Sequence, residues 1–590
     1  PPLEFGKLEI ESSTQNKGRS LPLHFRQPHP LLLTLSRNTK QRREASPISI
    51  SPTTSSYLTP LNNNSNTSNT SIMTSRNKYE NPLTSRYASA ECSLIFSPNY
   101  KFSTWRKMWL RLAEGEQQLG LQITDQQLNE MRAHLTLDET DYEVAAAKEK
   151  ELRHDVMAHV HAFGLRCPSA MPILHLGATS CFIADNTELI QIQAGLRLVK
   201  RKLMQVVSHL RTFADANKDT PTLGFTHYQP AQLVTIGKRA TLWLQDFLMD
   251  FETLDHLLEN LPFRGVKGTT GTQASFLELF NGDHEKVKAL NAYVTKASGF
   301  NKAIGVSGQT YTRKLDFQVC SCLSQIAQSA YKLGKCASFF LFLLSCQAVR
   351  HAKTVPLTTD HVYFFVVGTG GDIRLLANLK EIEEPFGAKQ VGSSAMAYKR
   401  NPMRSERMCS LARYVISLQA NTAHTACNQW LERTLDDSAN RRLTLPESFL
   451  GIDVVLTLAS NVVNGLHVWP NVVKARVAAE LPFMATEVIL MAAVKAGGDR
   501  QVLHEAIRDH SMEAAKRVKV DGSHNDLLER IAKDDLFHSV HGDLDSLLDP
   551  TLFIGRAPEQ VTEFLNEYVD PVLLANQALL NVESKDQVEV

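Results

Sequence analysis

The sequence predicts an all-α protein built on a bundle of long helices. Apolar side chains recur every three or four residues from Leu189 to Leu210 and again from Leu244 to Leu258. Such spacing places one continuous apolar stripe along a helix. Few runs in the chain alternate between polar and apolar residues, as a half-buried strand would. Long helices with one apolar face bury those faces against one another, so we expect a bundle.

Residues 1–80 differ in composition from the rest of the chain. They are rich in Ser, Thr, Asn and Pro and show no helical or alternating period, so we expect disorder. The chain opens with Pro1 and its first methionine is Met73, which favours translated leader sequence over residues 1–72 and a true start at Met73. A Ser-rich segment with few acidic residues also fits an organellar transit peptide. A genuine disordered tail is the third interpretation.

The composition of the 590 residues is that of a soluble globular protein, with 43% hydrophobic and 21% charged residues. The formal net charge of +1 argues against a nucleic-acid-binding surface. No apolar run is long enough to span a membrane. The nine cysteines form no CxxC pair, so the sequence predicts neither a zinc site nor a disulfide framework. We therefore expect no membrane or nucleic-acid partner and a reducing, cytoplasmic location.

The most informative stretch is Gly392–Arg407, which reads GSSAMAYKRNPMRSER. It brings together four cations, Lys399, Arg400, Arg404 and Arg407. A Gly-Ser-Ser loop without bulky residues can move over a substrate and present backbone N–H groups to it. A serine beside fixed cations loses its proton more easily, and arginines bind carboxylate or phosphate in bidentate fashion. Taken alone, such a cluster is more often a solvated basic loop.

This stretch resembles the GSSxMPxKxNP loop of the fumarase/aspartase superfamily of lyases, and its continuation KRNPMRSER is similar to that of the adenylosuccinate lyase family. Further segments resemble the same family, in the same order: Ser85–Ser89, Arg153–His161, Thr222–Pro230, Lys267–Ser275, Gly308–Lys314 and Glu432–Arg442. The likeness runs from about Asn81 to about Pro571. One departure is Ala397, where the family usually has Pro. We expect this change to loosen the loop without removing a reacting group.

The resemblance implies three helical domains, over residues 81–180, 181–468 and 469–590, and a homotetramer whose active sites are each assembled from three chains. Family members run directly from a segment like SAYKLGK into one like DIRLLANLKE, whereas this chain adds Cys336–Gly371 between them. Pro356 and the paired glycines of this addition cannot continue a helix, so it must bulge outward or split the helix. We interpret the addition as a retained intron or gene-model error, with a genuine looped-out insertion as the alternative.

The reaction implied by the resemblance is β-elimination of fumarate from a carbon–nitrogen bond, without a metal or organic cofactor. A base removes a weakly acidic proton beside a carboxylate, cations hold the doubly charged aci-carboxylate, and an acid protonates the leaving nitrogen. By resemblance Ser393 is the base, with Ser394 left open, and His227 is the acid, since imidazole titrates near neutrality. His154 is a second candidate that would orient the phosphate or assist His227. Without the family match, each would more often be structural.

The remaining candidates bind the substrate by the same resemblance. Arg153 and Asp155 flank His154 in a substrate-binding element. The succinyl carboxylates are expected to contact Thr179, Ser180, Gln309, Lys399 and Asn401. The phosphate and ribose of the nucleotide are expected to contact Arg86, Tyr87, Arg407, Arg433, Ser438 and Arg442. The string KGTTGTQAS lacks the GxxxxGK[ST] order, so it does not predict binding of a nucleoside triphosphate.

These motifs predict the activity of the family: release of fumarate from adenylosuccinate, which leaves AMP, and the same cleavage of the succinylated aminoimidazole carboxamide ribotide of purine synthesis. One alternative is another superfamily lyase that acts on argininosuccinate or malate. Those substrates lack a nucleotide monophosphate, so the arginines of RSER and SANRR argue against it. The other alternative is a non-catalytic structural relative, which gains weight if the added stretch is real and distorts the bundle.

Overall fold

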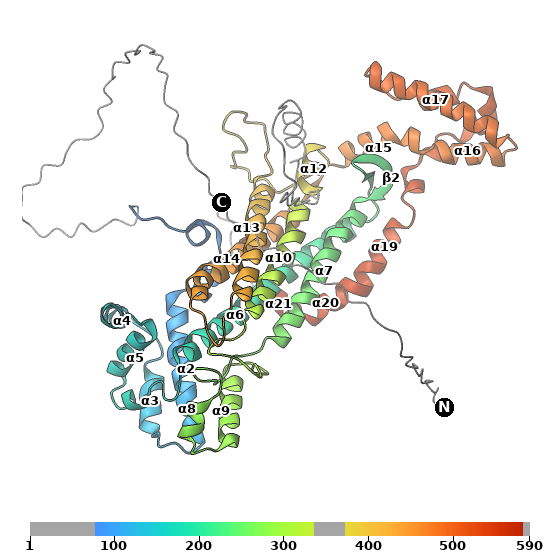
Figure 1. Ribbon diagram of the computed structural model, residues 1–590. Coiled ribbons are helices and arrows are strands. Elements are labelled where there is room, and N and C mark those ends of the chain that lie inside the picture. Colours follow the sequence, from blue (N-terminus) through green and yellow to red (C-terminus); the bar gives the residue numbers. More distant parts are fainter. Residues whose placement is uncertain (1–76, 335–371, 582–590) are drawn as a thin grey trace, which may run out of the picture. The chain divides into compact units, whose positions relative to one another are not determined.

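The computed structural model describes residues 77–334 and 372–581. Long helices lie alongside one another at its centre (Figure 1). They are α6 (Ser180–Ala216), α7 (Ile236–Asn260), α10 (Lys314–Gly334), α13 (Met403–Cys427) and α14 (Asp436–Asn464). This arrangement confirms the prediction of an all-α long-helix bundle. The expected leader, apart from residues 77–80, and the added stretch 336–371 lie outside the described residues.

Two contacts for each pair of neighbouring helices give the directions of the helices. The contacts are Glu188–Arg441 and His209–Ser460 for α6 and α14, Asp316–Arg441 and Cys320–Ser448 for α10 and α14, Ala214–Gly237 and Lys200–Asp255 for α6 and α7, and Tyr331–Cys409 and Ser321–Gln419 for α10 and α13. Helices α6, α10 and α14 therefore run one way, and α7 and α13 run the other. We call the two ends of the bundle the Ser180 end, where α6 begins, and the Met403 end, where α13 begins.

The apolar stripe predicted on α6 lies in the core of the bundle. Leu189, Leu196 and Leu203 are fully buried and belong to a core shared with α7, α10, α13 and α14. A Cβ atom on Gly195 of α6 would come within 2.7 Å of the Phe449 ring of α14. The missing side chain therefore lets these two helices pack closely around the buried ring.

Shorter helices precede and interrupt the bundle. Before α6 come η2 (Leu83–Tyr87), α1 (Ala90–Ile95), α2 (Pro98–Gln118), α3 (Asp125–Ala133), α4 (Glu139–Leu152), α5 (Asp155–Arg166) and η3 (Met171–Ile173). Between α7 and α10 lie α8 (Ala274–Leu279) and α9 (His284–Ala297), and α12 (Asp372–Asn378) precedes α13. Helix α2 packs on both α6 and α9, so it ties the early helices to the bundle.

More helices follow α14, and some of them build a second core. They are α15 (Pro470–Met484), α16 (Thr486–Lys495), α17 (Arg500–Val520), α18 (Leu527–Ile531), η4 (Asp535–Asp543), η5 (Ser546–Leu548), η6 (Pro550–Phe553), α19 (Ala557–Phe564), η7 (Leu565–Val569), α20 (Asp570–Ala575) and α21 (Gln577–Leu580). Buried residues between Ala485 and Leu544 form this core, whereas α19, α20 and α21 pack back on the bundle. The division of the chain into three domains stays a prediction.

Two antiparallel strand pairs interrupt the helices. Strands β1 (Pro221–Thr226) and β2 (Gln229–Thr235) form a hairpin between α6 and α7, and β3 (Ile382–Glu383) pairs with β4 (His467–Val468). The hairpin turn consists of His227 and Tyr228, with φ values of 51° and 65°. Positive φ at both central residues defines a type I′ turn, which usually contains Asn or Gly. The sequence does not predict this hairpin because neither turn residue belongs to the usual pair.

Helix α14 is long and apolar enough to cross a membrane by length and composition, and the bent pair α15 and α16 passes the same test. However, 72% of the apolar window of α14 is buried inside the protein. The helix also carries Asp437, Arg441 and Asp453, all of them buried and ion-paired within the bundle. Helix α14 is therefore a core helix.

Candidate active site

At the Ser180 end, His154 lies at the junction of α4 and α5. Arg153 ends α4 in a left-handed conformation with φ of 52°, which reverses the chain. His154 then caps α5, because its Nδ1 accepts a hydrogen bond from the backbone N–H of Met157 at 3.3 Å. Its neighbour Asp155 forms an ion pair with Arg442 of α14 at 3.1 Å. Three predicted substrate-binding residues thus accompany His154 at one place.

A second set of predicted residues meets at the start of α6. Thr179 is the N-cap residue of this helix and Ser180 is its first residue. The side chain of Gln309 donates to Thr179 Oγ1 at 3.1 Å, and its backbone N–H donates to the carbonyl of Glu432 at 2.9 Å. Segments far apart in the sequence therefore place two of the predicted carboxylate-binding side chains in direct contact.

Arg433 reaches the same place from the segment before α14. Its guanidinium donates to the thiol sulfur of Cys181 at 2.5 Å. Burial raises the pKa of this thiol to about 11, so the arginine faces a neutral sulfur. Ser438 is half-buried in the first turn of α14. Arg433 thus keeps a positive charge without a carboxylate partner among the described residues.

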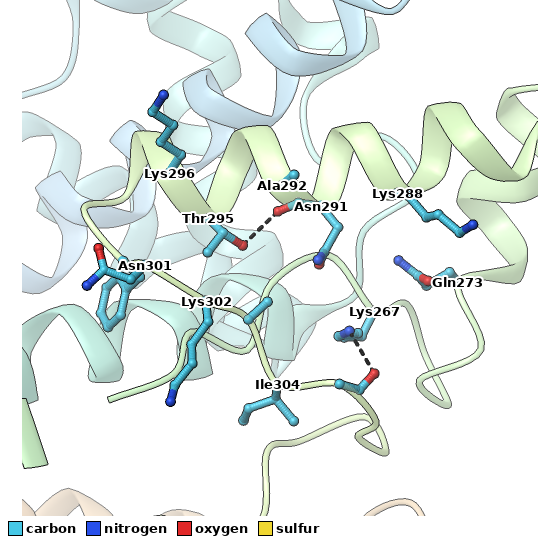
Figure 2. Close-up of a pocket in the computed structure, with 13 residues that line it drawn as sticks. Lys267, Gln273, Lys288, Asn291, Ala292, Thr295, Lys296, Asn301, Lys302 and Ile304 are labelled. Carbon is cyan, nitrogen blue, oxygen red and sulfur yellow. Dashed lines mark hydrogen bonds between the residues drawn. The ribbon is translucent and has the colours of Figure 1, made fainter. Parts of the chain in front are cut away.

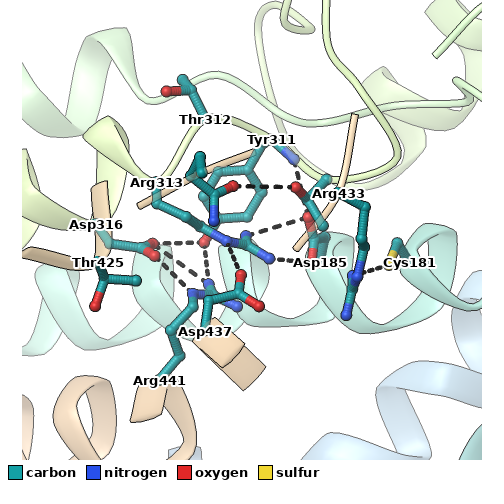
Figure 3. Close-up of polar contacts among 12 residues, drawn as sticks. Cys181, Asp185, Tyr311, Thr312, Arg313, Asp316, Thr425, Arg433, Asp437 and Arg441 are labelled. Carbon is teal, nitrogen blue, oxygen red and sulfur yellow. Dashed lines mark hydrogen bonds and ion pairs between the residues drawn. The ribbon is translucent and has the colours of Figure 1, made fainter. Parts of the chain in front are cut away.

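A buried ion network joins α6, the start of α10 and α14 next to these groups. Figure 3 shows Arg313 and Arg441 at its centre. Arg313 binds both carboxylate oxygens of Asp185 at 3.2 Å and one oxygen of Asp437 at 2.6 Å. The partners of Arg441 are Asp316, Glu188 and the hydroxyl of Tyr311. Together these bonds hold the first two turns of α14, which carry Ser438 and Arg442, against the other two helices.

Within this network, ion pairing opposes the effect of burial on the pKa of Asp185 and of Arg313. Burial by itself would raise the pKa of Asp185, but the charges of Arg313, Arg441 and Arg264 and the hydrogen bonds from Arg313 together outweigh it, so the pKa is lowered. Burial and Arg441 would each lower the pKa of Arg313, but Asp185, Tyr311 and Asp316 together outweigh them, so the pKa is raised. Removal of one partner would leave a buried charge uncompensated, which is strongly destabilising.

At the Met403 end, the loop before α13 carries Ser393. The backbone N–H groups of Ala395 and Met396 donate to Ser393 Oγ at 3.4 and 3.2 Å. The side chain of Asn401 donates to the carbonyl of Gly392 at 2.8 Å, which closes the base of the loop. A Cβ atom on Gly392 would lie 2.1 Å from the carbonyl oxygen of Lys399, so only glycine fits this closure.

The loop is anchored by Glu384, a buried carboxylate at the N-terminus of α13. It accepts hydrogen bonds from the backbone N–H groups of Arg404 and Ser405 at 3.0 and 2.9 Å, and from the hydroxyl of Ser405 at 2.7 Å. Arg404 donates to the carbonyl of Pro385 at 2.9 Å. Arg404 is thus occupied by the backbone, while Lys399 is exposed and has no partner among the described residues.

Arg86, Tyr87 and Arg407 come together near the same end. Both guanidinium groups stack on the Tyr87 ring, with Arg86 at 5.9 Å and Arg407 at 5.8 Å from the ring centroid. Cation–π contacts of this kind orient cations over the face of a ring. Three residues predicted to bind phosphate and ribose therefore form one cationic group.

His227 lies at the tip of the β1–β2 hairpin and is exposed. The hairpin packs on α7, α15 and α19. Non-glycine residues with positive φ store local strain, which is common in binding and catalytic segments. Within the described residues no hydrogen bond or ion pair joins His227 to Ser393 or His154.

One chain therefore distributes the candidate residues over the two ends of its bundle. The Ser180 end holds Arg153, His154, Asp155, Thr179, Ser180, Gln309, Arg433, Ser438 and Arg442. The Met403 end holds Arg86, Tyr87, Ser393, Lys399, Asn401 and Arg407, together with His227 in the hairpin that follows the end of α6. Helix α13 spans 25 residues between them, which is about 38 Å at the rise of an α-helix. A single chain thus keeps Ser393 away from His154.

Comparison with known proteins identifies the family. Adenylosuccinate lyase of Schizosaccharomyces pombe is 48% identical over 509 residues, which cover 86% of this chain and 98% of the relative. The chain belongs to the adenylosuccinate lyase family. Adenylosuccinate lyases of Saccharomyces cerevisiae and Schistosoma mansoni are 49% and 45% identical, over 86% and 84% of this chain and 98% and 96% of theirs. The chain is accordingly a lyase.

Family models agree with membership of the adenylosuccinate lyase family, and solved structures share its fold. Residues 482–564 match the model described as "Adenylosuccinate lyase C-terminus", and residues 110–337 match the model described as "Lyase". Two solved structures share the fold at 20% identity: the 3-carboxy-cis,cis-muconate lactonizing enzyme of Pseudomonas putida, with a TM-score of 0.64, and the fumarate lyase of Mesorhizobium sp. BNC1, with 0.62. Each match covers 82% of this chain, and 97% and 99% of those chains.

Several residues that support the site of this adenylosuccinate lyase family member escape sequence reasoning. Arg264 is fully buried and donates to the carbonyls of Gln309, Gly265 and Gly268. His175 accepts a hydrogen bond from the indole N–H of Trp109 at 2.9 Å, and burial lowers its pKa to about 4. Arg313 and Arg441 belong to the motifs Gly308–Lys314 and Glu432–Arg442. Only their burial in the structure distinguishes them from the exposed residues beside them.

Proposed function

We propose that the protein catalyses the β-elimination of fumarate from adenylosuccinate, with AMP as the other product, and from the succinylated aminoimidazole carboxamide ribotide. The observation that supports the proposal most strongly is the similarity to an adenylosuccinate lyase over nearly its whole length: 48% identity over 98% of the relative. The two cationic ends of the bundle, each with an acid–base group, support it chemically. No group of three His, Cys, Asp or Glu side chains in the described residues could hold a metal ion.

In this proposal Ser393 removes a proton from the carbon that lies beside a carboxylate and next to the carbon that bears the departing nitrogen. Serine is a weak base, so its alkoxide needs stabilisation. The two N–H groups that point at Ser393 Oγ provide it in the way an oxyanion hole does. Ser394 receives no such bond among the described residues. This contrast favours Ser393 over its neighbour.

The proton loss leaves a doubly charged aci-carboxylate, which cations and amides hold. We assign this task to Lys399 and Asn401 of the loop, and to Thr179, Ser180 and Gln309 of the Ser180 end. Lys399 is exposed and without a partner among the described residues, so its charge is available to the substrate. The carbon–nitrogen bond then breaks, its electron pair goes to the nitrogen, and His227 supplies the proton.

The nucleotide part of the substrate needs a different set of groups. We assign its phosphate and ribose to two groups: Arg86, Tyr87 and Arg407 at the Met403 end, and Arg433, Ser438 and Arg442 at the Ser180 end. Arg153, His154 and Asp155 adjoin the second group through the Asp155–Arg442 ion pair. Arginine suits this task because its planar fork binds phosphate in bidentate fashion.

We infer that each active site is shared between subunits of a homotetramer. The base and the groups around His154 lie at opposite ends of helices about 38 Å long. A small substrate cannot reach both ends of one chain, so the partner subunits must supply the missing end. All seven cysteines in the described residues are free thiols, which fits a reducing location such as the cytoplasm.

The assay that tests the function follows fumarate release from adenylosuccinate and from argininosuccinate by the full chain. We expect turnover of adenylosuccinate only, because argininosuccinate has no phosphate for the arginine groups. The Ser393→Ala variant serves as the background control. Turnover of argininosuccinate alone would make the chain a different superfamily lyase. Turnover of neither would make it a structural relative.

A further inference from the structure

A cavity of about 710 Å³ opens between α9 and the segments 267–273 and 300–305 (Figure 2). None of the candidate active-site residues lines it. Four lysines do: Lys267, Lys288, Lys296 and Lys302. Amide side chains of Gln273, Asn291 and Asn301 complete its polar lining, and no aspartate or glutamate is among the described residues around it. The lining therefore carries an excess of positive charge.

Lys267 is the buried lysine among the positively charged residues of this lining. Its side chain is only 6% exposed, and its ammonium group donates to the carbonyl of Gly305 at 3.3 Å. No carboxylate in the described residues forms an ion pair with it. Burial, and then the nearby Arg264 guanidinium, lower its pKa. A buried cation that adjoins a second buried cation and faces an open cavity is stabilised by an anion.

Two other lysines of the lining, Lys302 and Lys288, form no strong ion pair among the described residues. Lys302 donates to the neutral amide oxygen of Asn260 at 3.0 Å. Lys288 pairs with Glu285 at 2.7 Å, but the two side chains are 71% and 81% exposed. Exposed ion pairs contribute little free energy, so Lys288 can turn to a ligand at small cost.

Neutral donors accompany the cations. The side-chain oxygen of Asn291 accepts from the backbone N–H of Val266 at 2.9 Å, which leaves its amide N–H groups for another acceptor. In Figure 2, Lys267, Gln273 and Lys288 lie on one side of Asn291, and Lys296, Asn301 and Lys302 lie on the other. Ammonium and amide groups thus belong to the lining on both sides of Asn291, with Lys296 and Lys302 pointing away from Lys267 in this view.

We propose that this cavity binds a small anion through a phosphate group. No arginine in the described part of the chain lines the cavity, so its positive charge comes from lysines. Lysine binds phosphate as a point charge, and amide N–H groups complete the shell of donors around the remaining oxygens. The volume is that of an ordinary small-molecule site.

Calorimetric titration of the full chain with inorganic phosphate, at constant ionic strength, tests the proposal. We expect Lys267→Met to weaken phosphate binding by about tenfold or more, since a charged hydrogen bond is lost. Lys288→Glu reverses the charge at an exposed position and does not threaten folding. We expect it to weaken binding by about threefold or more. Thermal unfolding shows whether the Lys267→Met variant is folded. If that variant does not fold, the phosphate affinity of Lys288→Glu tests the proposal instead.

Two further variants locate the bound phosphate. Lys286→Met removes the same charge from α9 outside the cavity, so its affinity should stay within about twofold of the wild type. Arg407→Met removes a candidate phosphate group of the active site. The proposal is overturned if no phosphate binds, if the cavity variants bind like the wild type, or if only Arg407→Met loses binding. These outcomes do not depend on turnover, so the proposed function can fail separately.

Discussion

The environment of a single oxygen atom distinguishes the two serines of the Gly-Ser-Ser loop. Ser393 Oγ receives two backbone N–H groups, one from Ala395 and one from Met396. Hydrogen bonds to an anion are stronger than those to a neutral hydroxyl, so they favour the deprotonated form. The sequence left Ser393 and Ser394 as alternatives, because adjacent identical residues carry no information about which one the backbone will face.

Substitution of each serine tests this difference. We expect Ser393→Ala to lower turnover of adenylosuccinate by about 10²–10⁴, the usual effect of one acid–base group. Ser394→Ala should change turnover by less than about tenfold. Initial rates of fumarate release measure both. Because both residues lie in a loop, unfolding temperatures should match the wild type. A larger loss in Ser394→Ala would transfer the role of base to that serine.

A second residue-scale feature is Glu116 of α2, a carboxyl group that no sequence pattern distinguishes. It is fully buried, and neither of its oxygens has a hydrogen-bond partner in the described residues. Burial raises its pKa from 4.5 to about 9. The folded protein therefore keeps this carboxyl protonated in a pH range where the unfolded chain has already released the proton. The resulting stability is present below pH 4.5 and is lost as the pH rises towards 9.

We expect Glu116→Gln to remove this dependence, because an amide does not titrate. Near pH 5 the variant and the wild type should unfold at similar temperatures, whereas at about pH 8 the variant should unfold at least about 2 °C higher. Thermal unfolding across this range measures the difference. Glu143→Gln on the exposed face of α4 is the matched control. A gap that is constant with pH would show that Glu116 is ionised in the folded protein.

At the scale of elements, α13 and its preceding loop depend on one cap. Glu384 occupies the helix N-terminus, where unpaired N–H groups and the helix dipole favour a negative charge. The sequence indicated the cationic loop but not its anchor, because Glu384 lies 20 residues before Arg404. Contacts of that range depend on the fold and leave no local pattern.

We expect Glu384→Gln to loosen this junction, since the amide group would present N–H donors to the N–H groups of the helix. The helix cap is worth about 1 kcal/mol, so amides of the first turn of α13 should exchange hydrogen about fivefold faster. Hydrogen exchange read by mass spectrometry measures this. Glu383→Gln is the control, because Glu383 is only a distant partner of Arg400, at 3.6 Å. Equal exchange in both variants would contradict the role of the cap.

The β1–β2 hairpin, unlike the long helices, cannot be predicted from a local sequence pattern. A helix is indicated by a period of three to four residues, which the α6 stripe follows closely. The hairpin turn instead uses His227 and Tyr228, both with positive φ, where Asn or Gly would be expected. Packing on α7, α15 and α19 must hold this conformation. A locally unfavourable turn cannot be read from propensities, because its stability comes from distant segments.

At the scale of the whole molecule, the separation of the two bundle ends has a direct consequence. His154→Ala and Ser393→Ala should each be nearly inactive, because each removes a group that every site needs. When the two variants are unfolded, mixed and refolded together, a shared site can receive a native His154 and a native Ser393 from different chains. Random assortment in a symmetric oligomer then restores about a quarter of the wild-type activity.

The same refolding applied to each variant alone is the control. Activity should recover only in the mixture, and size-exclusion chromatography should show the same oligomer in all samples. If the mixture stays as inactive as its components, each active site is complete within one chain. His154 and Ser393 of the same chain would then have to come together through a rearrangement of the bundle.

By itself the sequence determined the helical class, the apolar stripes, the motifs and the family, because each of these is written in residues close together or in strings of fixed spacing. Tertiary structure alone decided which charged residues are exposed and which are buried. Arg442 reaches the surface beside His154, whereas its neighbour Arg441 lies in the ion network. One step along a helix turns a side chain by about 100°, so adjacent arginines face different surroundings that only packing between distant helices creates.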